Sequence, residues 1–184
     1  MKIIETELKD AFIIEPDVFS DNRGWFMETY SKINFKKNIE FVQDNHSFSK
    51  GKGIIRGLHC QINPHCQSKL IRCVKGEIVD VIVDIRQGSP TYKKHIKVLL
   101  NETNKKQLFI PKGFLHGFLT LTDNVEIQYK VDDYYSKKCD RSISYNDKDI
   151  NINWEIDNPI LSEKDLKAPL LKDSDCIFVY GETI

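Results

Sequence analysis

Side chains that can exchange protons or bind anions are concentrated on a few short segments of this chain. Arg56-Gly57-Leu58-His59-Cys60-Gln61 is followed by Gln67-Ser68-Lys69 and, further on, by Pro111-Lys112-Gly113-Phe114-Leu115-His116. They place imidazole, guanidinium, ammonium and carboxamide groups between apolar runs that are typical of β-strands. This grouping indicates a polar site within an apolar scaffold, suited to acid–base chemistry on a small polar molecule.

Composition limits the partners that such a site can serve. The chain has 184 residues, 40% of them hydrophobic, with 27 Lys+Arg balanced by 27 Asp+Glu. This length suits one sizeable core, so we expect a single domain over residues 1–184. The balanced charge argues against a nucleic-acid or anionic membrane partner and favours a small molecule.

The cysteines and the N-terminus indicate where the protein resides. Five cysteines, an odd number without a C-x-x-C pair, follow an N-terminus that has no apolar signal core. No apolar run approaches the roughly 18 residues that a membrane-spanning helix needs. We therefore expect a soluble protein in the reducing cytoplasm.

Alternating apolar residues predict that strands position these groups. Residues 77–86 place four aliphatic side chains on one face, whereas the other face mixes Ile78 and Ile82 with Asp80 and Asp84. Further strands are expected at 24–30, 41–48, 69–74, 95–100, 107–110, 118–122 and 125–131, with turn signals between them. Many short, regularly punctuated strands predict an all-β sandwich or barrel.

Helical signals are few. Residues 31–38 could form one or two turns, and Ser162 can cap a short helix that begins in Ser162-Glu163-Lys164-Asp165. The more polar C-terminal third, from Asn146 on, is expected to wrap the β body as loops and short helices.

The five histidines divide into two groups. A single histidine is more often structural than functional, and we assign that role to His46, His65 and His95. His59 and His116 each lie beside other polar groups at a strand edge, so a functional role is favoured for these two.

The segment Pro111-x-Gly113-x-x-His116 resembles the second motif of the cupin superfamily. The resemblance implies an all-β cupin jelly roll, or double-stranded β-helix, with a few short peripheral helices. Metal-binding cupins carry an H-x-H pair in their first motif, but here Gln61 stands where the second histidine belongs. Zinc or iron needs at least three well-placed ligands, and the metal set is incomplete, so no metal is expected.

A finer resemblance is to the dTDP-4-dehydrorhamnose 3,5-epimerases, a metal-free branch of the cupins. The matching segments include Phe19-x-Asp21-x-Arg23-Gly24, Gln43-Asp44-Asn45, Arg56-Gly57-Leu58-His59-x-Gln61, Gln67-x-Lys69-Leu70, Asp84-x-Arg86-x-x-Ser89-Pro90-Thr91, Tyr129-Lys130, Asp133-Tyr134-Tyr135 and Leu161-Ser162-x-Lys164-Asp165. The resemblance implies epimerisation at C3 and C5 of a nucleotide-linked 4-keto-6-deoxyhexose, most simply dTDP-4-dehydro-6-deoxyglucose. The resemblance also implies that the reaction passes through an enolate and uses neither metal nor organic cofactor.

The resemblance also implies roles for four catalytic residues. His59 is similar to the family's base, and Asp165 to the carboxylate that holds the imidazole and stabilises its protonated form. Tyr129 corresponds to the proton donor on the opposite face of the sugar. Lys69 corresponds to the cation that stabilises the enolate oxygen.

Further positions match the family's substrate contacts. Arg23, Arg56 and Lys164 resemble its diphosphate and sugar contacts, and Tyr135 resembles the residue that stacks on thymine. The remaining expected contacts are Glu28, Gln43, Asp44, Asn45, His116 and Asp140. Asp140 stands where relatives usually carry Glu, Cys60 replaces a common Tyr, and Ser68 replaces Gly, so these three could change the pocket.

The family's usual form is a homodimer in which an N-terminal strand crosses to the partner, and the segment before Phe19 is apolar enough for this. Alternatives stay open. The chain could epimerise only C3 or only C5 of a related sugar nucleotide. It could also be a metal-dependent cupin isomerase or oxygenase, or a non-catalytic carbohydrate-binding jelly roll.

Overall fold

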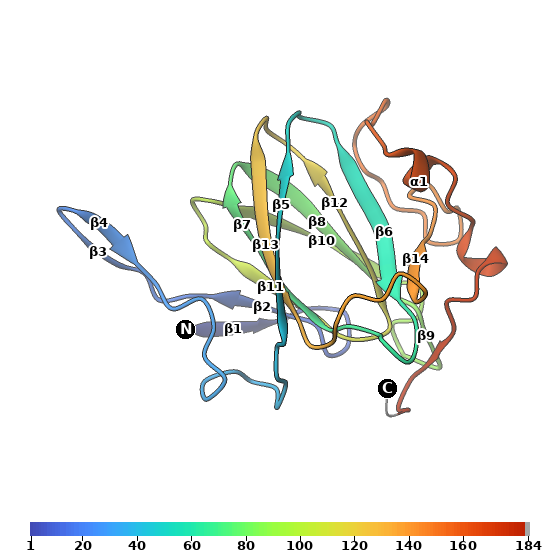
Figure 1. The fold of residues 1–184 in the computed structure, drawn as a ribbon, viewed down its shortest axis with the longest axis horizontal. Coiled ribbons are helices and arrows are strands. Elements are labelled where there is room, and N and C mark those ends of the chain that lie inside the picture. Colours follow the sequence, from blue (N-terminus) through green and yellow to red (C-terminus); the bar gives the residue numbers. More distant parts are fainter. Residues whose placement is uncertain (183–184) are drawn as a thin grey trace.

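Two antiparallel sheets make up the body of the protein in the computed structural model, which describes residues 1–182 (Figure 1). The six-stranded sheet has the order β1 (Lys2–Glu5), β2 (Phe12–Glu15), β11 (Gln107–Ile110), β7 (Lys69–Lys75), β13 (Val125–Val131) and β5 (Gln43–Ser49). The five-stranded sheet has the order β10 (His95–Asn101), β8 (Glu77–Asp84), β12 (Phe114–Thr120), β6 (Ile55–Gln61) and β14 (Asp140–Ser142). The all-β prediction is confirmed, and the last two residues of the predicted 1–184 domain lie outside the described residues.

Smaller elements surround this body. A hairpin of β3 (Phe19–Asp21) and β4 (Gly24–Phe26) projects far from the sheets (Figure 1). The short strands β9 (Arg86–Gln87) and β15 (Phe178–Val179) pair in parallel. Helix α1 (Glu163–Leu166) and the 3-10 turn η1 (Leu171–Asp173) lie in the C-terminal segment. No helix among the described residues is long and apolar enough to cross a membrane.

Both faces of the five-stranded sheet are buried. Its inner face shares an apolar cluster with the six-stranded sheet, to which Ile82 and Ile71 belong. Its outer face is covered by the C-terminal segment, where Val81 and Leu115 share a cluster with Trp154. This double burial explains why residues 77–84 are apolar on both faces, and it makes the acidic side chains of that strand unusual.

The expected elements match the structure unevenly. The strands predicted around residues 69–74, 77–86, 95–100, 107–110 and 125–131 are confirmed, as is the short helix capped by Ser162, whose Oγ accepts a hydrogen bond from the Asp165 amide at 3.1 Å. Residues 55–61, for which no strand is predicted, form β6. The segment before Phe19, expected to supply a strand that crosses to a partner, forms β1 and β2, which pair within the sheet of their own chain. The loops and short helices expected after Asn146 are also confirmed.

The prediction of a helix over residues 31–38 is wrong, because these residues form turns. Phe35 is 9% exposed, and its ring packs against those of Phe12 and Phe109 at centroid distances of 5.9 and 5.6 Å. Tertiary packing of one aromatic side chain outweighs the weak local preference for a helical turn.

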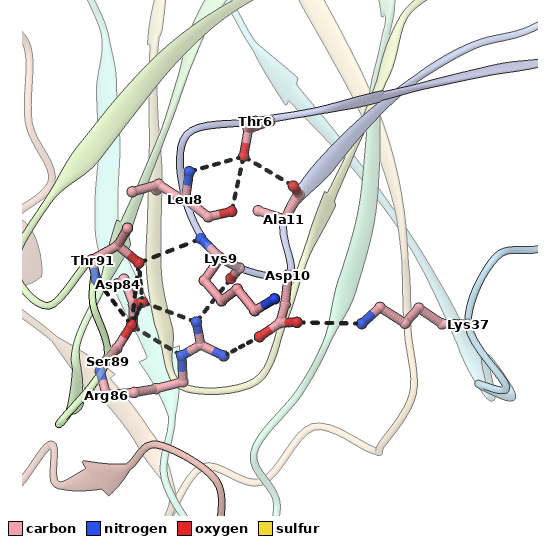
Figure 2. Close-up of polar contacts among 10 residues, drawn as sticks. All are labelled: Thr6, Leu8, Lys9, Asp10, Ala11, Lys37, Asp84, Arg86, Ser89 and Thr91. Carbon is pink, nitrogen blue, oxygen red and sulfur yellow. Dashed lines mark hydrogen bonds and ion pairs between the residues drawn. The ribbon is translucent and has the colours of Figure 1, made fainter.

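A buried arginine joins the loop between β1 and β2 to the end of β8. Figure 2 shows Arg86 donating from Nε and Nη2 to Asp84 at 2.9 Å each, and from Nη1 to Asp10 at 3.0 Å. Ser89 and Thr91 donate their hydroxyl hydrogens to the same Asp84 carboxylate at 2.5 and 2.7 Å. Burial raises the pKa of Asp84, but these hydrogen bonds outweigh it and hold the pKa below its usual value.

Strands β6 and β12 approach each other unusually closely at two glycines. A Cβ added to Gly57 would lie 2.5 Å from the Gly117 Cα and 2.9 Å from the His116 carbonyl oxygen, and the Gly57 φ is +133°. No other residue type has both the freedom to adopt that φ and the space. This contact fixes the register in which His59 lies opposite His116.

We expect Gly57→Ala to lower the free energy of unfolding by about 2–6 kcal/mol, since backbone strain and overpacking act together. Urea denaturation measures the change. The control is Gly51→Ala, whose added Cβ meets only Ile54 Cδ1 at 3.9 Å, and it should change stability by less than about 0.5 kcal/mol. Equal losses in the two variants would contradict the proposed constraint.

Candidate active site

A cavity of about 140 Å³ opens between the two sheets near β6 and β13. Its lining residues are Gln43, Asn45, His59, Cys60, Gln61, Gln67, Lys69, Tyr129, Tyr135 and Asp140. Strands β5, β7 and β13 supply one wall, and β6 and β14 supply the opposite wall. The structure thus brings together seven of the residues predicted to act in catalysis or substrate binding.

His59 is held by a carboxylate from the C-terminal segment. Its Nε2 lies 2.6 Å from Oδ1 of Asp165, whose side chain is 4% exposed. Burial raises the pKa of Asp165, but hydrogen bonds from His59, Ser162 and the Gly57 amide outweigh it and hold the pKa below its usual value. The ionised carboxylate only accepts, so Nε2 carries the proton and Nδ1 is the basic nitrogen. Nδ1 has no hydrogen-bond partner among residues 1–182.

A second imidazole–carboxylate pair lies deeper between the sheets. His116 Nε2 is 2.7 Å from Oδ1 of Asp80, which is fully buried. Burial lowers the pKa of His116 despite the attraction of Asp80, so its ring is neutral at pH 7. Oδ2 of Asp80 is buried without a hydrogen-bond partner among the described residues.

Three site residues were not predicted as such from the sequence: Gln61 and Gln67, which line the cavity, and Asp80, which pairs with His116. For Asp80, the sequence signal was its position in residues 77–86, where acidic and apolar residues alternate on one face of a strand. Because β8 is buried on both faces, a carboxylate there requires a polar partner, and His116 on the neighbouring strand β12 is that partner.

Lys69 and Tyr129 face His59 from the six-stranded sheet. They lie on the neighbouring strands β7 and β13, where Lys69 pairs with Val131, two residues from Tyr129. Burial lowers the pKa of the Lys69 ammonium, against the attraction of Cys60, Asp80 and Asp140. Burial raises the pKa of the Tyr129 phenol, so it stays protonated at neutral pH. The cavity therefore has a basic nitrogen on one wall and an acidic phenol on the other.

Polar residues at the rim form a connected group. The Asp140 carboxylate accepts hydrogen bonds from Lys164 Nζ at 2.5 Å and from Tyr135 OH at 3.4 Å. The Tyr135 amide donates to Gln43 Oε1 at 3.1 Å, and Gln43 Nε2 donates to Asn45 Oδ1 at 2.9 Å. The Asp140 side chain is shorter than that of the Glu that relatives usually carry, yet it contacts both the Tyr135 hydroxyl and the Lys164 ammonium at the rim.

Two glutamines hold the loop that carries Tyr135. Gln61 Oε1 accepts from the Ser136 amide at 2.6 Å, and its Nε2 donates to the His65 and Tyr134 carbonyl oxygens at 2.6 and 3.2 Å. Gln67 Nε2 donates to the Asp133 carbonyl oxygen at 2.7 Å. The Gln61 amide, at the position of the second cupin histidine, is therefore occupied with the protein backbone. Among residues 1–182 there is no group of three or more His, Cys, Asp or Glu side chains placed to hold a metal ion.

Four further predicted substrate contacts are not among the residues that line the cavity of their own chain. Arg23 is at the tip of the projecting hairpin, where its guanidinium binds Asp21 at 2.7 Å. Glu28 is exposed after β4, and Asp44 faces solvent from β5, paired with Lys130 at 2.8 Å. Arg56 is exposed on β6, where Nη1 donates to the Phe48 carbonyl oxygen at 3.5 Å.

His46, His65 and Ser68 lie outside the cavity, whereas Cys60 borders it. His46 pairs with Glu126 at 3.1 Å and His65 with Asp133 at 3.4 Å. Ser68 is buried and lines a different cavity, of about 520 Å³. The Cys60 sulfur contacts that of Cys176. The Ser68 side chain is therefore not part of the wall around Lys69.

The fold is an antiparallel jelly roll with one interior cavity. Around that cavity lie the imidazole of His59, fixed by Asp165, the buried ammonium of Lys69 and the phenol of Tyr129. These features define a cupin-type protein equipped for proton transfer. The family model for dTDP-4-dehydrorhamnose 3,5-epimerase matches residues 5–173. The enzyme of that name from Shigella flexneri is 50% identical over 179 residues, which are 95% of this chain and 98% of the relative. The chain belongs to the dTDP-4-dehydrorhamnose 3,5-epimerase family.

Solved structures agree with this assignment. The crystal structure of dTDP-4-dehydrorhamnose 3,5-epimerase from Bacillus anthracis, with TDP and PPi bound, has a TM-score of 0.89 and 48% identity and covers 92% of this chain and 99% of its own. The crystal structure of dTDP-6-deoxy-D-glucose-3,5-epimerase from Legionella pneumophila, in complex with dTDP-4-keto-L-rhamnose, has a TM-score of 0.91 and 39% identity. It covers 98% of this chain and 99% of its own. The predicted cupin jelly roll is confirmed.

We expect Asp165→Asn to lower kcat by about 10²–10⁴, because an amide cannot hold the tautomer or stabilise the imidazolium. Steady-state kinetics at pH 7 measures the change. Glu163→Gln is the matched control on the same helix, since its carboxylate is 91% exposed, and it should leave kcat unchanged. A similar kcat in both variants would show that Asp165 does not act through His59.

The pH profile reports on Lys69. Burial lowers the pKa of Lys69 below 10.5, the usual value for lysine. The wild-type kcat should therefore decrease on the alkaline side of its pH profile, with a midpoint below pH 10.5, as the ammonium loses its proton. Lys69→Met should lower kcat by about 10²–10³ and remove that limb. A limb that persists unchanged in Lys69→Met would assign it to another group.

Proposed function

We propose that this protein epimerises dTDP-4-dehydro-6-deoxyglucose at C3 and C5 to give dTDP-4-dehydrorhamnose, as part of deoxysugar biosynthesis. The observation that carries the proposal is the placement of His59 and Tyr129 on opposite walls of one cavity. Inversion of a carbon requires removal of a proton on one face and return on the other, and this cavity has a base and an acid so placed. Family membership supports the dTDP sugar as substrate and favours an epimerase over a metal-dependent cupin or a binding module.

Proton abstraction begins at His59. Nδ1 takes the proton from C3 or C5, next to the C4 ketone, while Asp165 stabilises the resulting imidazolium through the 2.6 Å hydrogen bond. The electrons move onto the C4 oxygen, where the Lys69 ammonium stabilises the enolate. Tyr129 then donates its phenolic proton to the opposite face of the same carbon, and both groups are restored by exchange with water.

This chemistry requires neither a metal nor an organic cofactor. Hydrogens next to a ketone are weakly acidic, and a buried cation at the ketone oxygen increases that acidity. The Lys69 ammonium lies in a largely desolvated position, where its charge acts more strongly than in water.

The rim of the cavity is proposed to hold the nucleotide. Tyr135 offers a ring that is 59% exposed for stacking on the base, and Lys164 and Arg56 offer cations for the diphosphate. Gln43, Asn45 and Asp140 line the cavity between these groups and His59. His116 lies beneath, paired with Asp80, and supports the interior wall.

We also propose a homodimer in which the β3–β4 hairpin of each chain reaches the cavity of its partner. β1 and β2 pair with the sheet of their own chain, so the hairpin, rather than the segment before Phe19, is the projecting part. It exposes Phe19, Trp25 and Phe26 at 65%, 56% and 69%. Exposed aromatic side chains of this size favour burial against another surface. The crossing would bring Arg23 and Glu28 to the partner's site.

A cytoplasmic location is proposed on the basis of the thiols. All five cysteines are free and buried, a state typical of proteins in a reducing compartment.

The crossing hairpin can be tested by mixing two inactive variants, Arg23→Ala and His59→Ala. If each site takes Arg23 from the partner, a mixed dimer has one intact site, and random mixing should restore about a quarter of wild-type activity. Co-expression with two affinity tags isolates the mixed dimer. No recovery in the purified mixed dimer would show that Arg23 serves its own chain or none.

The reaction itself is tested by incubating the substrate with the enzyme in D₂O and following deuterium by NMR. The wild-type protein should incorporate deuterium at both C3 and C5, and His59→Ala should incorporate it at neither. His46→Ala, which alters a surface histidine, is the control and should behave as wild type. Deuterium at a single carbon would indicate a single-site epimerase, whereas wild-type exchange in His59→Ala would exclude the proposed base.

A further inference from the structure

Two buried thiols meet on the outer face of the five-stranded sheet, and one of them belongs to Cys60, which also borders the cavity. Cys60 in β6 and Cys176, two residues before β15, are 5% and 6% exposed and belong to one apolar cluster. Their sulfur atoms are 3.6 Å apart, although 116 positions separate the residues in the chain. Sulfur atoms in a disulfide are about 2.05 Å apart, so closure requires an approach of about 1.5 Å.

We propose that Cys60 and Cys176 form a reversible modification site, at which a peroxide oxidises the two thiols to a disulfide that ties the C-terminal segment to β6. The proposal does not depend on the proposed epimerisation, because neither thiol takes part in that proton transfer. Hydrogen peroxide is the oxidant, and a small dithiol reverses the step by thiol–disulfide exchange.

An ion pair holds the two thiols together. Arg141 on β14 is the cross-strand partner of Cys60. Its guanidinium binds the carboxylate of Asp175, the neighbour of Cys176, at 2.6 and 2.7 Å. The chain beside each cysteine is thus fixed to the chain beside the other. Of the five cysteines in the described part of the chain, these two alone have their sulfur atoms in mutual hydrogen-bonding contact.

The two thiols differ in reactivity. The hydrogen bond from Cys60 lowers the pKa of the Cys176 thiol, against the opposing effect of burial. The same contact, together with burial, raises the pKa of Cys60. This lowered pKa, together with the position of Cys176 beside an exposed residue, assigns Cys176 as the nucleophile. Its neighbour Ile177 is 64% exposed, so the path from solvent is short.

The oxidation balances as two steps. The Cys176 thiolate attacks one peroxide oxygen, the O–O bond breaks, and a sulfenic acid and hydroxide form. The Cys60 sulfur then attacks the Cys176 sulfur, an S–S bond forms, and the S–O bond breaks. The departing hydroxide takes the Cys60 proton. In sum, two thiols and one hydrogen peroxide give one disulfide and two waters.

Closure is expected to stabilise the site rather than block it. Cys60 belongs to the outer cluster and also borders the cavity, but alternation along β6 directs its side chain to the opposite side of the strand from that of His59. The new bond joins the strand that carries His59 to the segment that carries Asp165. It should therefore preserve activity and resist separation of these elements on heating.

The test treats the wild-type protein with hydrogen peroxide and alkylates the remaining thiols under denaturing conditions. Intact mass should show two of the five thiols protected, and peptide mapping should identify a Cys60–Cys176 link. Tm should rise by about 5–10 °C and return to its starting value with a dithiol. Epimerase activity at ordinary temperature should be retained.

Two variants serve as the comparison. Cys176→Ala should lose the protection and the rise in Tm, whereas Cys139→Ser, which changes another buried thiol, should retain both. Five alkylated thiols, a different pair in the map, or stable oxygen addition at one cysteine would overturn the proposal. A Cys60–Cys176 link that abolishes activity would overturn its stabilising role.

Discussion

The close contact between β6 and β12 is the constraint on which the rest of the molecule depends. With no side chain at Gly57 or Gly117, the two strands approach until a single added carbon would collide with backbone. The resulting register sets His59, which lines the cavity, opposite the buried His116. Each histidine then meets a carboxylate from a different part of the fold, Asp165 from the C-terminal segment and Asp80 from β8. Displacement of β6 would therefore disturb both pairs together.

Burial gives these groups their chemical properties. The same desolvation that lowers the pKa of Lys69 raises that of Tyr129, so the phenol keeps the proton that it is proposed to donate. Charges placed in such an interior act strongly on an enolate because little water screens them. The unpartnered Oδ2 of Asp80 adds a further polar atom to this interior. Fixed hydrogen bonds, above all those around Arg86 and Gln61, hold the surrounding loops in place.

Local patterns predicted much of the fold and the types of the site residues. Period-2 alternation located most strands of the body, and Ser162 marked the start of α1. Short motifs placed His59, Lys69, Tyr129 and Asp165 in one site through family resemblance. What the patterns could not predict depends on contacts between distant residues. Phe35 is buried by Phe12 and Phe109 rather than by a helix, the partner of Asp80 is set by strand register, and the position of Arg23 is set by a hairpin that leaves the body.

The central claim is that one cavity carries its base and its acid on opposite walls. It is tested most directly by comparing deuterium wash-in with inversion in Tyr129→Phe, using NMR of the sugar in D₂O. With His59 intact and the opposite donor removed, the account predicts that C3 and C5 still acquire deuterium while inversion falls far below exchange. Loss of exchange and inversion in equal proportion, in a folded Tyr129→Phe protein that still binds dTDP, would contradict it.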